Sequence, residues 1–163
     1  MELKNLSFLG LFLYLISIVT GEDLARGWND NISWLSFEDG MKASKAEQKP
    51  MMLVIHKSWC GACRKLKPKF AEDKEIEELS KNFVMVNTLD EEEPVDQQFS
   101  PDGGYIPRIL FLDPQGKVDK SIVNVNGNPS YKYFYPMPNG IVKSMKSAAA
   151  KFVSESKRTT DEL

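Results

Sequence analysis

Cysteine and histidine are scarce in this sequence. Its 163 residues include two cysteines, Cys60 and Cys63, and one histidine, His56. Two cysteines cannot form the set of disulfides that stabilises many small secreted domains. A tetrahedral zinc site needs more ligands than these side chains supply, so zinc would have to recruit carboxylates or a second chain. We therefore expect no metal site, no bound cofactor and a fold that is stabilised by its core.

Strong net charge and long apolar runs are also lacking. The formal net charge is −2, which argues against nucleic acid as a partner. The longest apolar stretch, from Phe8 to Val19, is shorter than the roughly 20 residues that a membrane-spanning helix needs. We see no internal repeat or low-complexity tract, and we expect no membrane span.

The first residues are typical of a secretory signal peptide, which we place at residues 1–21. Lys4 precedes the apolar stretch, and Val19-Thr20-Gly21 supplies small residues for cleavage. An uncleaved anchor is the alternative. After cleavage about 140 residues remain, which fits one domain, over residues 22–156. In that domain Asn31-Ile32-Ser33 is an acceptor sequence for N-glycosylation, so Asn31 is a possible modification site.

The chain ends in a sequence close to the retention signal of the endoplasmic reticulum. The last four residues are Thr160, Asp161, Glu162 and Leu163. Only the first of them departs from the usual signal, which has lysine in place of threonine. Together the two ends predict the endoplasmic-reticulum lumen, with the retention receptor as a partner and residues 157–163 as a flexible tail. An ordinary solvated acidic terminus is the alternative.

The stretch Trp59-Cys60-Gly61-Ala62-Cys63 predicts a working dithiol. A disulfide across such a short loop contributes roughly 2 kcal/mol of stability, so stapling is a weak reason for the pair. Thiol-disulfide exchange, in contrast, needs an attacking thiolate and a nearby thiol to resolve the mixed disulfide. We assign Cys60 as the nucleophile and Cys63 as the resolving thiol. An inert structural pair is the alternative.

A helix that begins at Cys60 would lower the pKa of this thiol through its N-terminal N–H groups and its dipole. Positive potential would be added by the basic residues that follow, Arg64, Lys65, Lys67 and Lys69.

The hydrophobic pattern predicts alternating helices and strands. Helices are expected over residues 31–48, from the CxxC motif to residue 71 with a proline at Pro68, over 75–81 and over 140–154. Strands are expected over residues 51–55, 83–87, 107–112 and 118–123, the last two joined by a hairpin turn at 113–116. The acidic segment 90–96 is expected to be a solvated loop. This order indicates the α/β class, with a single mixed sheet flanked by helices.

The order of elements, with the CxxC motif at the end of the first strand and Ile106-Pro107 at the start of the third, resembles the thioredoxin fold over nearly the whole mature chain. The resemblance implies that Pro107 is cis and packs beside the dithiol, and that the backbone of Ile106 pairs with substrate. It also implies a substrate-binding surface that includes Trp59, Gly61 and Ala62.

Several segments resemble a closer group, the small thioredoxin-fold oxidoreductases of the endoplasmic reticulum that are related to the anterior gradient proteins. They are residues 56–63, 66–68, 83–87, 102–108 and 127–135. The resemblance implies thiol-disulfide exchange with secretory client proteins, and glutathione as co-substrate. The two-cysteine form separates the chain from anterior gradient relatives that keep only one cysteine.

One position departs from the thioredoxin pattern. Val54 stands where a buried carboxylate usually helps to move the proton of the resolving thiol. His56 and Lys57 are close in sequence, but a lone histidine at the end of a strand is more often packed or solvated than catalytic.

The aromatic residues Tyr131, Tyr133, Phe134 and Tyr135 suggest a second function, a peptide-binding or chaperone-like module in which thiol chemistry is secondary. Plain packing of these residues in the core is the favoured alternative. The sequence leaves open the clients, the net direction of exchange, the redox potential and the oligomeric state.

Overall fold

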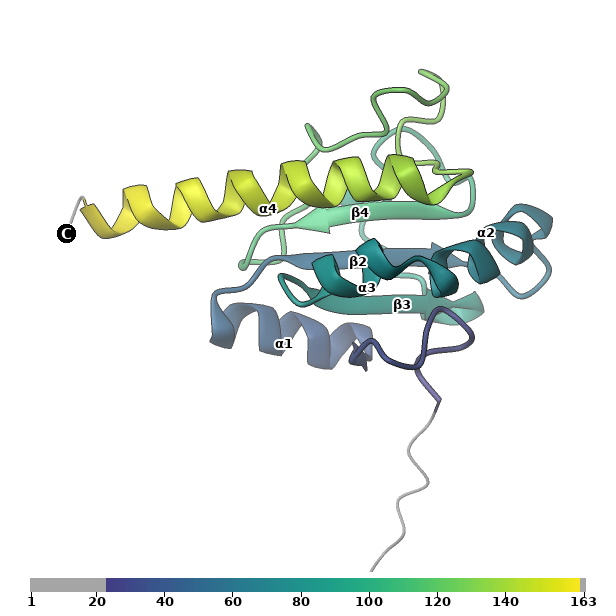
Figure 1. Cartoon of the computed structure of the whole chain (residues 1–163), viewed down its shortest axis with the longest axis horizontal. Helices are drawn as coiled ribbons and strands as arrows, with labels where there is room; N and C mark the ends of the chain where they lie inside the picture. The colour runs from purple at the N-terminus through teal and green to yellow at the C-terminus, as the bar shows by residue number, and fades with distance from the viewer. Residues whose placement is uncertain (1–22, 162–163) are drawn as a thin grey trace, which may run out of the picture.

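A mixed four-stranded sheet, in the order β1-β3-β2-β4, lies at the centre of the molecule (Figure 1). The computed structural model describes the backbone of residues 23–161 and the side chains of residues 23–152. The strands are β1 Trp34–Leu35, β2 Met51–His56, β3 Val84–Leu89 and β4 Arg108–Leu112. Both β1 and β2 run parallel to β3, whereas β4 runs antiparallel to β2. This sheet and its flanking helices confirm the predicted fold class.

The helices cover the two faces of the sheet. They are α1 Phe37–Glu47, α2 Gly61–Glu72, α3 Lys74–Ser80 and α4 Pro138–Asp161. Side chains alternate along β2, so that Met52 and Val54 join a core cluster with residues of α2, α3 and α4. Met51, Leu53 and Ile55 join the cluster on the other face, against which α1 packs. No helix in the described range is both long and apolar enough to cross a membrane.

The structure confirms the strands expected at residues 51–55, 83–87 and 107–112, and the helices expected after the CxxC motif and at 75–81. Every residue of β2 is buried, as its continuous apolar run predicts for a central strand. Pro68 lies inside α2.

The helix predicted over residues 31–48 is wrong at its start. Trp34 and Leu35 form strand β1, which pairs with Met85 and Val86. Trp34 is buried in one cluster and Leu35 packs against the other, which is the alternation of a strand. The helix begins only after Ser36, whose hydroxyl accepts the N–H of Asp39 at 3.1 Å and caps the first turn.

The strand predicted over residues 118–123 does not form. The hairpin turn is present, but pairing with β4 stops at a single bridge between Leu112 and Val118. Further along the edge of β4, Ile109 N–H donates to the carbonyl of Tyr133 at 3.0 Å. The segment that contains Tyr133 thus lies at the edge of β4, where residues 120–123 were predicted to pair.

The closing helix is longer than predicted. The backbone of α4 is helical to Asp161, whereas the sequence predicted an end at residue 154 and a flexible tail from residue 157. The predicted signal peptide, residues 1–21, lies outside the described residues. So do Glu162 and Leu163 of the predicted retention signal, and the side chains of Thr160 and Asp161.

Candidate functional site

The ends of three strands meet at one edge of the sheet. Because β2 and β3 are parallel, they end together, with His56 paired to Leu89. Because β4 is antiparallel to β2, it begins at the same edge, with Arg108 opposite Ile55. This edge lies at the right of Figure 1, where β2 leads into α2. The topology therefore brings the dithiol loop, residues 57–60, to the same edge as the docking loop, residues 100–107.

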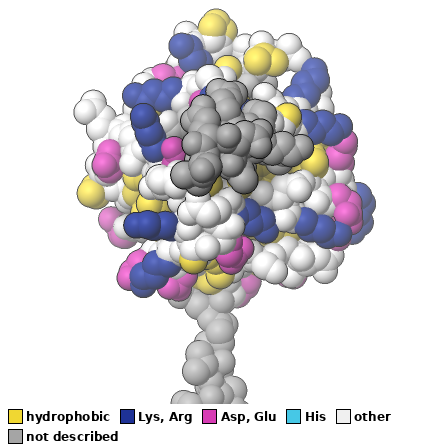
Figure 2. Space-filling model, turned by 90° about the vertical axis from the view of Figure 1, so that its left-hand side faces the viewer, with side chains coloured by type: hydrophobic (Ala, Val, Ile, Leu, Met, Phe, Trp, Pro, Cys, Tyr) yellow, Lys and Arg dark blue, Asp and Glu magenta, His cyan; other side chains and the backbone are white. Residues whose placement is uncertain are grey.

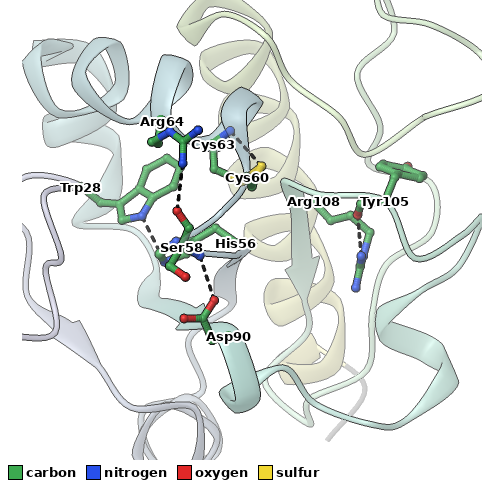
Figure 3. The surroundings of a disulfide bond; sticks show 9 residues. All are labelled: Trp28, His56, Ser58, Cys60, Cys63, Arg64, Asp90, Tyr105 and Arg108. Atoms are coloured by element: carbon green, nitrogen blue, oxygen red, sulfur yellow. Dashed lines mark hydrogen bonds between the residues drawn. A yellow bond between two sulfur atoms is a disulfide. The ribbon is translucent and has the colours of Figure 1, made fainter.

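The two cysteines form a disulfide at the start of α2. Cys60 is the N-cap residue, and its Sγ accepts the N–H of Cys63 at 3.0 Å (Figure 3). The same N–H and the positive end of the helix would stabilise a thiolate at Cys60 in the reduced protein. Cys63 faces the core and is 1% exposed, against 4% for Cys60. This geometry supports Cys60 as the attacking thiol and Cys63 as the resolving thiol.

The residues predicted to bind substrate come from the CxxC motif and from the docking loop, and they differ in exposure. The side chain of Trp59 is 71% exposed, and Gly61 is also exposed. Ala62 and Ile106 are half-buried and Pro107 is buried. The Ile106–Pro107 bond is cis, as the resemblance implies. An indole in solvent beside a disulfide is available to contact another molecule.

Only part of the predicted positive potential lies at the dithiol loop. Arg64 reaches back and donates to the carbonyl of Ser58 at 3.3 Å. Lys67 instead lies over the indole of Trp28, at 5.8 Å from the ring centre. Lys69 reaches Met137, where its Nζ lies 3.2 Å from the sulfur.

The acidic segment after β3, predicted to be a solvated loop, is exposed at Glu91, Glu92 and Asp96, but Asp90 and Glu93 are half-buried. Its first three residues, Asp90–Glu92, form a short 3-10 helix, and a second one, Gln97–Phe99, follows the segment. Asp90 Oδ1 accepts the N–H of Ser58 at 2.8 Å, and this bond holds the pKa of Asp90 below its ordinary value. Figure 3 shows Asp90 and Arg64 reaching Ser58 from opposite sides. The contact of this segment with the dithiol loop could have been predicted from its place after a parallel strand, because side chains there lie at the same edge of the sheet as the end of β2.

Glu93 in the same segment binds both loops of the site. Its carboxylate forms ion pairs with Lys57, at 2.7 Å, and with Arg108. The side chain of Arg108 is fully buried and also donates to the carbonyls of Phe99, at 3.0 Å, and of Tyr105. Neither Glu93 nor Arg108 was predicted from the sequence as a residue of the site.

His56 lies in the core rather than in solvent, with 1% of its surface exposed. Trp28 Nε1–H donates to His56 Nε2 at 3.2 Å, and Asn87 Oδ1 lies 3.1 Å from the same nitrogen. Burial lowers the pKa of His56 to about 4, so the imidazole is neutral at neutral pH. Val54 is also fully buried, in the apolar cluster beneath α2. Neither position supplies the carboxylate found in other thioredoxin-fold proteins.

The aromatic segment belongs largely to the core. Tyr133 and Tyr135 are 3% and 0% exposed, whereas Tyr131 is 46% exposed. The ring of Tyr131 packs edge-on against Tyr105, with 5.0 Å between the ring centres. Tyr105 belongs to the docking loop, so Tyr131 adds an exposed aromatic side chain next to that loop.

The predicted glycosylation site is in contact with α3 rather than with the dithiol loop. Asn31 is exposed, and its side-chain amide donates to Glu77 at 3.4 Å. Within the described residues, no group of three or more histidine, cysteine, aspartate or glutamate side chains is arranged to hold a metal ion.

Comparison with known proteins places this site in a family. The thioredoxin-like family model matches residues 33–114. Anterior gradient protein 3 of Mus musculus is 37% identical over 136 residues, covering 82% of this chain and 81% of the relative. Anterior gradient protein 3 of Homo sapiens is 33% identical over 163 residues, covering 91% of this chain and 97% of the relative.

The fold is shared with solved thioredoxins. The solution structure of a thioredoxin from Thermus thermophilus superimposes with a TM-score of 0.54 at 16% identity, covering 75% of this chain and 90% of that protein. The family model and the two relatives agree with this fold, and the chain therefore belongs to the thioredoxin-like family and is a homologue of the anterior gradient proteins.

Proposed function

We propose that the protein is a thiol-disulfide oxidoreductase of the endoplasmic-reticulum lumen, which exchanges disulfides with secretory client proteins and with glutathione. The observation that carries the proposal is the position of Cys60. Its sulfur caps α2 and accepts the N–H of Cys63, at the sheet edge that also holds the cis Ile106–Pro107 bond. The lumenal location rests on the two chain ends, residues 1–21 and 160–163.

In the direction of client reduction, the Cys60 thiolate attacks one sulfur of a client disulfide. A Cys60–client disulfide forms, and the other client sulfur leaves as a thiolate. Cys63, as a thiolate, then attacks the Cys60 sulfur, which forms the Cys60–Cys63 disulfide and releases the second client thiolate. Two glutathione thiols reduce this disulfide and leave as glutathione disulfide. Client oxidation is the reverse sequence.

The resolving step needs a proton acceptor for Cys63. Val54 cannot serve, and the neutral imidazole of His56 is a weak base because burial lowers its pKa to about 4. We therefore propose that solvent, rather than a buried carboxylate, accepts the proton of the Cys63 thiol.

Within the family, we infer that the chain is of the type of thioredoxin domain-containing protein 12. The support is the two-cysteine motif together with the matching segments at residues 56–63, 102–108 and 127–135. Anterior gradient relatives with a single cysteine would trap mixed disulfides but could not resolve them within the chain.

Substitution of each cysteine tests the proposal. Cys60→Ser is expected to reduce turnover of a disulfide-bonded client peptide to the background rate, because the exchange then lacks its attacking thiolate. Cys63→Ser is expected to accumulate mixed disulfides with the client, because the resolving thiol is missing. Both are measured by glutathione-coupled turnover and by non-reducing mass analysis. Unchanged turnover by Cys60→Ser would contradict the proposal.

The redox potential gives a second test. Equilibration with glutathione buffers, followed by alkylation and mass analysis, measures the reduction potential of the Cys60–Cys63 pair. We expect a value close to the lumenal poise, about −180 to −210 mV. A potential below about −300 mV would mean that the glutathione pool cannot reduce the disulfide.

A peptide-binding function is the second candidate, and the exposed rings of Trp59 and Tyr131 favour it. The burial of Tyr133 and Tyr135 removes half of the aromatic cluster on which it was based. A variant without cysteines separates the two functions: full rescue of client maturation by that variant would favour the binding module.

A further inference from the structure

Glu93 connects the dithiol loop to the docking loop. One carboxylate oxygen pairs with Lys57 of the dithiol loop at 2.7 Å. The other oxygen pairs with Arg108, which directly follows Pro107. The side chains of Lys57 and Glu93 are only 18% and 25% exposed, so both ion pairs are shielded from solvent more than surface pairs are. A single side chain therefore joins two segments that are far apart in the sequence.

Each partner of Glu93 is bonded to a functional part of its loop. Cys60 N–H donates to the carbonyl of Lys57 at 3.2 Å, so the backbone position of Lys57 affects the position of Cys60, the proposed nucleophile. Arg108 binds the carbonyl of Tyr105, the residue before Ile106. The network thus extends from Cys60 to the backbone that is predicted to pair with substrate.

Glu93 also sets the local charge. Partial burial by itself would raise the pKa of Glu93, but the hydrogen bonds and charges of Lys57 and Arg108 outweigh burial and hold it below its ordinary value. The ionised carboxylate offsets two cations that would otherwise both stabilise a thiolate at Cys60. Arg64 and Asp90, which bind Ser58 of the same loop, contribute one charge of each sign.

We propose that Glu93 is a positioning residue for the exchange reaction: it fixes the dithiol loop relative to the docking loop, and its charge limits how strongly Lys57 and Arg108 stabilise the Cys60 thiolate. The inference rests on the proposed function, since it concerns the reactivity of the same dithiol.

The test compares two variants that are expected to act in opposite directions. Glu93→Gln removes the carboxylate charge and should lower the pKa of the Cys60 thiol by roughly half a unit. Lys57→Met removes a cation and should raise it by a similar amount. The pKa is measured on the reduced full-length protein from the rate of alkylation of Cys60 as a function of pH. The equilibrium with glutathione should shift about threefold toward the dithiol in Glu93→Gln.

Glu91→Gln is the matched control. Glu91 is exposed and lies in the same short helix as Asp90, so its charge is screened by solvent. We expect no measurable change in the Cys60 pKa for this variant. Shifts of the same sign in Glu93→Gln and Lys57→Met, no shift in either, or an equal shift in Glu91→Gln would overturn the inference. If Glu93→Gln does not fold, the rise in the Cys60 pKa expected for Lys57→Met tests the inference by itself.

The readout separates this inference from the proposed function. Opposite pKa shifts in a protein that turns over no client disulfide would support the effect of Glu93 on the Cys60 thiol and contradict the proposed enzymatic function. Normal turnover without the shifts would support the enzyme and contradict the role of Glu93.

Discussion

The neutral form of His56 is the form that fits its buried site. Nε2 accepts Trp28 Nε1–H, while Asn87 Oδ1, 3.1 Å from the same nitrogen, favours a proton there and partly opposes the effect of burial on the pKa. The second ring nitrogen, Nδ1, is buried and has no hydrogen-bond partner within the described residues. Burial lowers the pKa of His56 from 6.5 to about 4, with the cations Lys67 and Arg26 acting in the same direction. Protonation therefore costs more in the folded protein than in the unfolded chain.

This difference predicts a pH-dependent stability. The unfolded chain takes up the proton near pH 6.5, while folded His56 stays neutral to about pH 4. Its contribution is therefore fully present above pH 6.5 and is lost as pH falls from there toward 4. We expect the free energy of unfolding to fall by about 2 kcal/mol between pH 7 and pH 5, measured by urea unfolding. Since the chain has one histidine, His56→Gln should flatten the curve in this window; a slope that persists in the variant would contradict the assignment.

The contacts of individual charged residues could not be predicted from the local sequence. The acidic run after β3 gave no local signal that Asp90 and Glu93 bind the dithiol loop, because acidic runs are usually solvated. Cys60 and Cys63 were predictable, because their spacing alone specifies the chemistry.

Among the elements, α1 packs closely on the sheet through Gly40. A Cβ atom added at Gly40 would lie 2.4 Å from Cγ2 of Val86 and 3.2 Å from Cε of Met51. Both neighbours are fully buried in the core between α1 and the sheet. Gly40, although glycine is a poor helix former, is thus the residue that allows α1 to approach β3.

Gly40→Ala should therefore destabilise the protein. Alanine favours the helix by about 1 kcal/mol over glycine, but overpacking against Val86 costs about 1–3 kcal/mol. We expect a net loss of about 1 kcal/mol in the free energy of unfolding, measured by urea denaturation. Glu47→Ala, at an exposed position of the same helix, is the control and should change it by less than about 0.5 kcal/mol. A stabilised Gly40→Ala variant would show that α1 can move away from the sheet without cost.

The boundaries of elements depended on partners outside the local sequence. Apolar spacing over residues 31–48 fits a helix loosely, yet Trp34 and Leu35 pair with β3 because that edge of the sheet is open to them. Residues 118–123 follow the hairpin turn and were predicted to continue it as a strand, but the backbone of Tyr133 bonds to the edge of β4 instead.

For the whole molecule, stability comes from two apolar clusters on opposite faces of the sheet rather than from the disulfide. We expect reduction of the Cys60–Cys63 bond to change the free energy of unfolding by no more than about 2 kcal/mol, because the loop that it closes is short. Urea unfolding with and without reductant measures this difference. A reduced protein without a cooperative transition would show that the pair is a structural staple.

The charge of the molecule is well mixed on the end opposite the dithiol. Figure 2 shows basic and acidic side chains interspersed on this face. The mixture agrees with the net charge of −2. Such a face lacks the single-signed field that would attract a polyanion.

The sequence by itself determined the dithiol, the buried central strand β2, the helix that Cys60 caps and the thioredoxin fold. The dithiol, β2 and the helix follow from local spacing and from a continuous apolar run. The fold followed from the resemblance of the motifs and of the order of elements to the thioredoxin family. Tertiary structure alone decided that Glu93 joins Lys57 to Arg108, that His56 is buried and neutral, and that Tyr133 lies in the core while Tyr131 is exposed. These outcomes depend on which strand ends share an edge of the sheet, since burial and ion pairing are set by neighbours that are distant in the sequence.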